Sequence, residues 1–250
     1  MWFVYAYIFV VGLVLGSFYN VVGLRVPAKK SIVRPRSACA SCGHTLTYAE
    51  LVPVFSYIWQ QGKCKTCGAS ISPIYLIFEL LTGLLFVYTF DLLGFQAEVF
   101  VGWTLVSLLI IIVVSDLTYM LIPNIILLFF FVIFAIERLI IPLQPWWSSL
   151  SGAGIAFILL FLIAAFSKGG MGGGDVKLFA LLGFVLGGKL VILAFLLSAF
   201  FGTVFGLLGL MTGRLKRNKP MPFGPYIMMG TLVAYFFGNE MIRYYISLFY

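Results

Sequence analysis

Charged residues are scarce in this chain. Only 10% of its 250 residues are Asp, Glu, Lys or Arg, whereas 62% are hydrophobic. A soluble domain usually carries about 25% charged residues on its surface, so this shortage excludes an ordinary soluble globular domain. The long apolar runs also lack the period of two that membrane β-strands show, which argues against a β-barrel. The composition therefore predicts an all-α, polytopic membrane protein.

Acidic residues are scarcer than basic ones. The chain has 8 Asp and Glu and 16 Lys and Arg, which gives a net charge of +8. In a soluble protein this excess would suggest nucleic-acid binding. In a membrane protein, basic residues gather in cytoplasmic loops, so we expect the lipid bilayer as a partner and no nucleic acid. We expect no cleavable signal peptide, since residues 1–24 lack both a basic n-region and an A-x-A-like site.

Seven apolar segments approach or exceed the roughly 20 residues that a membrane-spanning helix needs, and an eighth, residues 175–186, is on the short side. They cover residues 1–24, 74–93, 99–115, 124–141, 149–166, 175–186, 190–211 and 226–249. Gly12 and Gly16 in the first segment form a small-residue pattern typical of packed membrane helices. The chain is thus predicted to have a first helix (1–24), a soluble insertion (25–73) and a membrane domain of about seven helices (74–250).

The basic residues predict how these segments are oriented. If residues 25–73 face the cytoplasm and the spans alternate, 13 of the 16 Lys and Arg lie inside and 3 lie outside. This asymmetry is what the positive-inside rule expects. The layout places both termini outside, and it places Asp116 and Asp175 at the same cytoplasmic face.

All four cysteines lie in the soluble insertion, as the pairs Cys39-x-x-Cys42 and Cys64-x-x-Cys67. Two such pairs at this spacing indicate a structural zinc site, because each turn presents two thiolates to one metal ion. A disulfide-bonded extracellular loop is the alternative, which a reducing cytoplasm disfavours. His44 is either an alternative ligand or a surface residue. Zinc would supply much of the folding energy of so short a segment.

Asp116 and Asp175 each stand at the edge of an apolar run, where a charge is costly and indicates a functional site. Gly172, Gly173 and Gly174 precede Asp175, and glycines in such a loop let a backbone approach a ligand closely. Two neighbouring carboxylates share one proton, so one can activate water while the other polarises a carbonyl. This pattern predicts an aspartyl protease dyad, with two solvated helix ends as the alternative. Glu79 is a third acid at similar depth, either functional or hydrogen-bonded for structure.

Together these motifs resemble the type IV prepilin leader peptidase family over nearly the whole chain. The residues that carry the resemblance are, in order, Gly16-Ser17-Phe18 with Asn20, the four cysteines with Leu51-Val52-Pro53 and Gly62-Lys63-Cys64, Ser72-Pro73-Ile74-Tyr75 leading to Glu79, Asp116 with Ile122-Pro123-Asn124, Gly172 and Gly174 with Asp175, and Phe223-Gly224-Pro225.

The resemblance implies that Asp116 and Asp175 are catalytic and that Gly172, Gly174, Glu79, Pro123, Gly224 and Pro225 support the substrate loop or its motifs. It implies prepilin or pseudopilin substrates of type IV pilus, secretion or competence systems, cut after a leader glycine at the cytoplasmic face of the bacterial inner membrane. Many members also N-methylate the new amino terminus with S-adenosylmethionine. Since no G-x-G-x-x-G fingerprint is present, methylation rests on the resemblance alone.

Two other functions stay open. One is a different intramembrane G-x-G-D protease, of the presenilin or signal-peptide-peptidase type, which lacks a paired-cysteine loop. The other is a proton-coupled membrane carrier that uses the two aspartates. Carriers usually place such acids near the membrane midplane between repeated halves. Here both aspartates lie at one predicted face, and the sequence shows no repeat.

Overall fold

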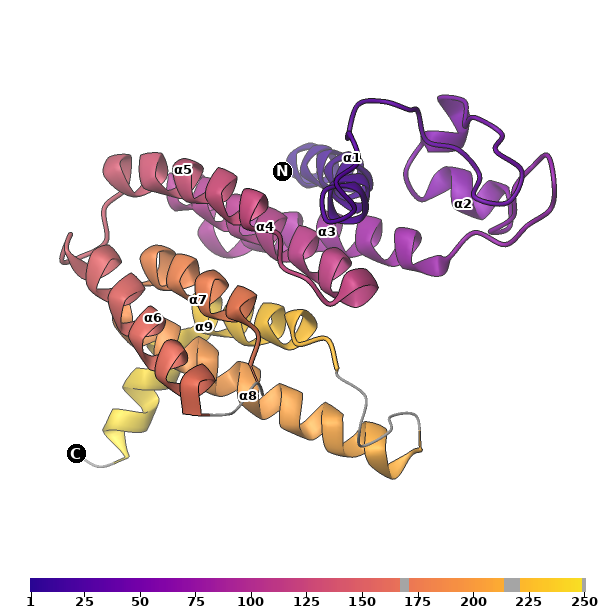
Figure 1. Cartoon of the computed structure of the whole chain (residues 1–250). Helices are drawn as coiled ribbons and strands as arrows, with labels where there is room; N and C mark the ends of the chain where they lie inside the picture. Colours follow the sequence, from indigo (N-terminus) through magenta and orange to yellow (C-terminus); the bar gives the residue numbers. More distant parts are fainter. Residues whose placement is uncertain (167–170, 214–220, 249–250) are drawn as a thin grey trace. The chain divides into compact units, whose positions relative to one another are not determined.

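The computed structural model describes residues 1–166, 171–213 and 221–248, and within them the chain is helical, with two isolated β-bridges and no strand (Figure 1). Long helices correspond to all eight predicted segments. Their bounds are α1 Trp2–Arg25, α3 Pro73–Leu93, α4 Glu98–Tyr119, α5 Asn124–Ile140, α6 Ser148–Phe166, α7 Gly173–Leu186, α8 Gly188–Met211 and α9 Gly224–Ser247. The insertion adds the short η1 (Ala49–Leu51) and α2 (Phe55–Trp59). The predicted end of the last span, residue 249, lies outside the described residues.

Five of these helices, α1, α3, α4, α6 and α8, are long and apolar enough to cross a membrane. The predicted class, an all-α polytopic membrane protein with a small insertion after its first helix, is therefore confirmed. The count of eight spans stays a prediction, since α5 has 17 residues and α7 has 14.

The chain divides into two compact units, Met1–Val114 and Ser115–Tyr250. In the first unit α1 packs on α3 through small residues. A Cβ added to Gly12 would lie 2.7 Å from the Cα of Gly83, and one added to Gly16 would lie 2.9 Å from the hydroxyl oxygen of Thr82. The predicted small-residue pattern therefore marks a true helix contact.

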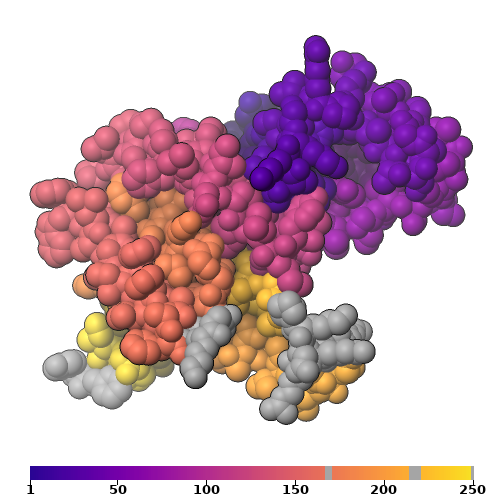
Figure 2. All heavy atoms as spheres, viewed as in Figure 1, coloured from indigo at the N-terminus to yellow at the C-terminus, as the bar shows by residue number. Residues whose placement is uncertain are grey.

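In the second unit α6 packs on α7, and α8 packs on α9. The side chains of α6 and α7 lie against each other in the space-filling view (Figure 2). Gly152 and Gly183 meet at this contact, where a Cβ on either residue would collide with the backbone of the other helix. Close backbone contact between α6 and α7 therefore depends on glycine at both positions.

Two polar contacts with α5 fix the position of α7. At one end, the buried Arg138 donates from Nη2 to the carbonyl oxygen of Val185 at 2.7 Å. At the other end, Lys177 Nζ donates to Asn124 Oδ1 at 3.1 Å. The Arg138 guanidinium thus satisfies a carbonyl at the carboxyl end of α7, which would otherwise lack a partner within the helix. These contacts hold the helix that carries Asp175.

Candidate functional site

Asp116 lies in the last turn of α4 and is 7% exposed. Its Oδ2 accepts a hydrogen bond from the backbone N–H of Gly224 at 2.6 Å. This donor is the first residue of α9. The first N–H groups of a helix have no partner within the helix and favour negative charge, so α9 is built to bind this carboxylate.

The late motif Phe223-Gly224-Pro225 has a physical role in this contact. Pro225 occupies the first turn of α9, where a missing N–H costs nothing. A Cβ on Gly224 would lie 2.9 Å from Oδ2 of Asp116 and 3.0 Å from its Cβ. Only glycine therefore lets the α9 backbone approach Asp116 this closely.

Asp175 is the third residue of α7, and Gly172 caps the helix. The backbone N–H of Gly172 donates to Asp175 Oδ2 at 3.3 Å, and the N–H of Asp175 donates to the Gly172 carbonyl oxygen at 3.1 Å. The Asp175 carboxylate thus makes half of a capping box, because glycine has no side chain to make the other half. The expectation that Gly173 and Gly174 are loop residues is wrong, because α7 already begins at Gly173. Residues 167–170 of that predicted loop lie outside the described residues.

The segment that follows α4 lies against the start of α7. A Cβ on Gly174 would lie 3.0 Å from the Cβ of Ile122, so the motif glycine allows this contact. Pro123 caps α5, and Asn124 at the start of α5 accepts the hydrogen bond from Lys177. Gly174 therefore contacts Ile122 directly, and Pro123 follows Ile122 as the cap of α5.

Both aspartates belong to the second unit, Ser115–Tyr250. Each also accepts a backbone N–H at a helix start, from α9 for Asp116 and from α7 for Asp175. The second unit thus holds both carboxylates that the sequence singled out, each against the start of a helix. That they share a proton and activate water stays a prediction.

Glu79 lies in the first unit. Its hydrogen bond agrees with the structural role that the sequence analysis gave as one of two possibilities. It is 8% exposed, and its Oε2 accepts the backbone N–H of Val54 at 2.8 Å. Val54 has a positive φ of 64° and comes just before α2. Glu79 therefore attaches the insertion to α3.

We expect Gly224→Ala to lower the turnover of an Asp116-dependent reaction by about 10²-fold, since a misplacement of about 1 Å has that cost. The added Cβ would push the carboxylate of Asp116 away from the start of α9. Gly154→Ala is the matched control, because a Cβ there meets nothing within 4 Å. The turnover of both purified variants measures the difference. Equal rates in the two variants would show that the α9 contact does not position Asp116.

The four cysteines cluster as a possible metal site, as their spacing predicts. Their sulfur atoms all lie within 4.8 Å of one another, with Cys39 and Cys67 at 3.8 Å and Cys42 and Cys64 at 4.0 Å. Tetrahedral zinc with Zn–S bonds of about 2.3 Å requires sulfur atoms about 3.8 Å apart. The residues therefore fit a structural zinc ion with all four positions filled.

The same local structure occurs twice around this site. In the first pair the N–H of Cys39 donates to the His44 carbonyl oxygen at 2.8 Å, and Gly43 donates to the Cys39 carbonyl oxygen at 3.0 Å. Cys64 makes the equivalent bond to Ala69 at 2.8 Å, and Gly68 donates back to Cys64 at 2.9 Å. Each turn ends at a glycine with positive φ, which other residues rarely adopt. The predicted turns after Cys42 and Cys67 are confirmed.

Backbone groups in these turns favour the metal-binding form of the sulfur atoms. The N–H groups of Cys42 and Ser41 lower the pKa of Cys39 to about 6. The N–H groups of Cys67 and Thr66 likewise lower the pKa of Cys64. The thiolate is the form that binds metal, so these N–H groups favour it at Cys39 and Cys64, whereas burial and the neighbouring cysteines raise the pKa of Cys42 to about 11.

His44 is not part of the metal-ligating cluster in the described residues. Its Nε2 lies 3.3 Å from Glu50 Oε2, which also accepts the N–H and the hydroxyl of Thr47, each at 2.8 Å. The donors of Thr47 and then His44 lower the pKa of Glu50 to about 2. The structure therefore agrees with the interpretation of His44 as a surface residue and not as an alternative metal ligand.

The fold is that of a multi-pass membrane protein with two carboxylates at helix starts in one unit and a four-cysteine cluster that could hold a metal ion in the other. Residues 10–92 match the Bacterial Peptidase A24 N-terminal domain, and residues 103–207 match the Type IV leader peptidase family. The chain belongs to the type IV leader peptidase family.

Several relatives carry the name prepilin leader peptidase/N-methyltransferase. The protein of Bacillus subtilis strain 168 is 46% identical over 241 residues, which cover 96% of this chain and 97% of the relative. The protein of Aeromonas salmonicida strain A449 is 32% identical, covering 98% and 95% of the two chains. That of Pseudomonas aeruginosa is 30% identical, covering 94% and 91%. No solved structure matches the chain.

Proposed function

We propose that this chain is an aspartyl endopeptidase of the bacterial inner membrane that removes the basic leader from type IV prepilins or pseudopilins, with Asp116 and Asp175 as the catalytic pair. The observation that supports this proposal is that both carboxylates lie in the same unit, and each accepts a backbone N–H at a helix start. The names of the relatives support the choice of substrate.

The chemistry follows from the shared proton. The ionised carboxylate takes a proton from water, whose oxygen attacks the scissile carbonyl carbon, while the protonated carboxyl group donates to the carbonyl oxygen. As the C–N bond breaks, a proton passes to the departing nitrogen. Neither a metal ion nor a covalent intermediate is required.

The place of the pair along the helices suits the proposed substrate. Asp116 ends the apolar α4, and Asp175 begins the apolar α7. A prepilin changes from a polar leader to an apolar helix at its cleavage site, so its scissile bond would lie at this boundary while its helix stays in the bilayer. The distribution of Lys and Arg supports the cytoplasmic face.

The name of the relatives also includes N-methylation of the product. S-adenosylmethionine, when bound, supplies an electrophilic methyl group for the new amino terminus. The zinc module has a structural role in this proposal, because four thiolates leave no position for a substrate.

Co-expression with a test prepilin examines both activities. We expect leader removal by gel shift, a new amino terminus directly after the leader glycine by mass spectrometry, and the added mass of one methyl group. A prepilin that keeps its leader, or loses it at another bond, would contradict the peptidase assignment. Cleavage without the methyl group would contradict only the second activity.

A further inference from the structure

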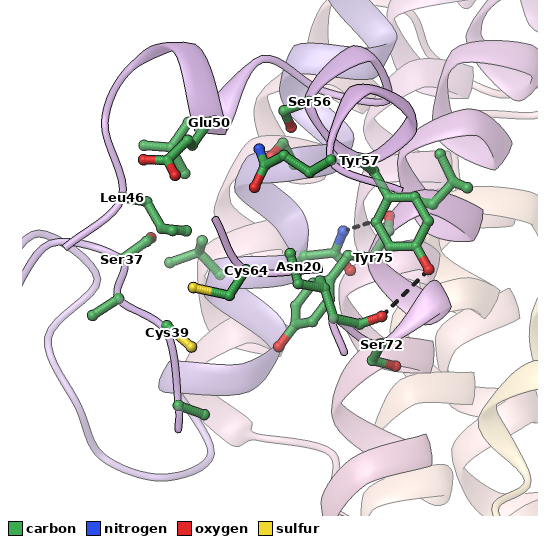
Figure 3. Close-up of a pocket in the computed structure, with 18 of the residues that line it drawn as sticks. Asn20, Ser37, Cys39, Leu46, Glu50, Ser56, Tyr57, Cys64, Ser72 and Tyr75 are labelled. Carbon is green, nitrogen blue, oxygen red and sulfur yellow. Dashed lines mark hydrogen bonds between the residues drawn. The ribbon is translucent and has the colours of Figure 1, made fainter. Parts of the chain in front are cut away.

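Helix α2 of the insertion exposes an apolar face. Phe55, Ile58 and Trp59 are 68%, 63% and 85% exposed. Ser56 and Tyr57 lie on the other face of the helix and line the cavity between the insertion and the ends of α1 and α3 (Figure 3). The short helix therefore has two different faces, and its more apolar face is the one that the insertion leaves uncovered.

The preceding 3-10 helix, η1, extends this apolar face. It contacts α2, and exposed apolar residues recur every three or four positions from the cap of η1 to the end of α2. Exposed clusters of this kind mark sites that contact another molecule or a membrane. We call the cluster the η1–α2 patch, and its members are Tyr48, Leu51, Val52, Phe55, Ile58 and Trp59.

A hydrogen bond fixes the position of α2 along α3. The backbone N–H of Val54, just before α2, donates to Glu79 Oε2 at 2.8 Å. Glu79 is about 9 Å along α3 from Pro73, at 1.5 Å per residue. Residues 74–78 between them are all apolar or aromatic, and α3 is long and apolar enough to cross a membrane. The start of α2 thus lies beside the apolar part of α3, at the edge of the bilayer, and not in the water beyond the helix.

The charges of the insertion suit a membrane surface. Glu50 is the one acid in residues 25–73, and it is buried and hydrogen-bonded within the insertion. The Arg36 guanidinium lies 4.9 Å from the centre of the Tyr48 ring, so a basic group accompanies the patch. Aromatic and basic side chains together are typical of segments that lie in the membrane interface. The exposed basic residues of the insertion are Lys29, Lys30, Arg34, Arg36, Lys63 and Lys65.

We infer that the η1–α2 patch inserts into the headgroup–acyl boundary of the bilayer that α1 and α3 cross, so that the insertion is docked on the membrane. Tyr48, Phe55 and Trp59 anchor it at this boundary, where aromatic rings are favoured, and the basic side chains lie among anionic headgroups. Because α1 and α3 already hold the insertion at the membrane, this docking is intramolecular and needs few contacts. It does not depend on which reaction the chain catalyses.

Trp59 reports directly on this contact. The zinc-loaded full-length protein is placed in vesicles of phosphatidylethanolamine and phosphatidylglycerol, and the emission of Trp59→Phe is subtracted from that of the wild type. Since an interfacial segment is buried about 5–10 Å, we expect lipids brominated in the upper acyl chain to quench at least about half of the Trp59 emission. We expect acrylamide, a quencher dissolved in the water, to have little effect.

Tyr57→Trp in the Trp59→Phe protein is the matched control, because it places an indole on the face of α2 that lines the cavity. We expect the brominated lipids to quench this indole much less than Trp59. Trp59 emission that acrylamide quenches and brominated lipids do not would overturn the inference, and the patch would then be free to bind a protein.

A pair of charged variants tests what the contact does for the insertion. In the same vesicles we expect Trp59→Glu to raise amide hydrogen exchange in residues 52–62 by at least about tenfold, a difference of about 1.4 kcal/mol. Thr66→Glu adds the same charge at an exposed residue outside the patch, and we expect it to exchange like the wild type. Zinc content shows whether each variant is folded. Wild-type exchange in a zinc-loaded Trp59→Glu protein would contradict the docking, and the quenching of Trp59 decides the question if this variant loses its zinc.

Discussion

Replacing either Asp116 or Asp175 by asparagine should lower leader cleavage by at least about 10³-fold, because acid–base catalysis by positioned side chains contributes about 10²–10⁴-fold. Asparagine keeps the size and can still accept the N–H groups of Gly224 or Gly172, but it can neither take nor give the proton. The measurement is the rate of leader removal from a test prepilin in proteoliposomes. Folding is checked by the zinc content and by extraction of the protein from the membrane.

Asp91→Asn is the control for this experiment. Asp91 is an exposed acid in the last turn of α3, where it accepts a hydrogen bond from the Tyr5 hydroxyl at 3.0 Å. We expect this variant to cleave like the wild type. If Asp116→Asn and Asp175→Asn also cleave like the wild type, the carboxylates are not catalytic. The proton-coupled carrier would then be the function to test, by measuring proton flux.

Removing zinc should make the insertion sensitive to proteolysis while the membrane helices stay folded. The insertion has only the short η1 and α2 and two isolated β-bridges, so few other contacts order it. A structural zinc site contributes about 10–16 kcal/mol of apparent binding free energy, far more than such a segment gains from its own packing. We expect a chelator to raise cleavage within residues 25–73 by at least about tenfold, and added zinc to reverse the change.

Cys64→Ser tests the same point without a chelator. It removes one ligand and should make the insertion as protease-sensitive as chelation does. Thr66→Ala changes an exposed side chain in the same turn and should leave the insertion protected. Unchanged proteolysis after metal removal would mean that packing, and not the metal, orders this segment.

The fold was predictable because it depends on the length and composition of apolar runs. Each predicted segment is a helix, since a continuous run of about 20 apolar residues in lipid must satisfy its backbone groups internally. The cysteine module was also predictable, because its geometry is local: each turn closes within six residues, from Cys39 to His44 and from Cys64 to Ala69.

The prediction that Gly173 and Gly174 lie in a loop was wrong because the low helix propensity of glycine applies to the interior of a helix and not to its first turn. Gly173 and Gly174 fall in the first turn of α7, where N–H groups lack helical partners in any case. The reason for glycine here is contact, since Gly174 lies against Ile122. The start of a helix that packs on a distant segment leaves no local signal.

The roles of Phe223-Gly224-Pro225 and of the exposed face of α2 depend on tertiary structure. The sequence supplied the motif only through family resemblance, and it did not indicate that the start of α9 binds Asp116, 108 positions away in the chain. The hydrogen bond between Lys177 and Asn124 was likewise not predicted from the sequence. Pro225 at a helix start was the one available signal, because proline is frequent there.

The central claim is that Asp116 and Asp175 act as one catalytic pair. Its most direct test is single-turnover leader cleavage by the wild type, the two single Asp→Asn variants and the double variant in the same liposomes. Residues that act as a unit are strongly non-additive, so the double variant should cleave about as slowly as either single variant. A double variant slowed by the product of the two single effects would show that the carboxylates act independently, and would contradict the account.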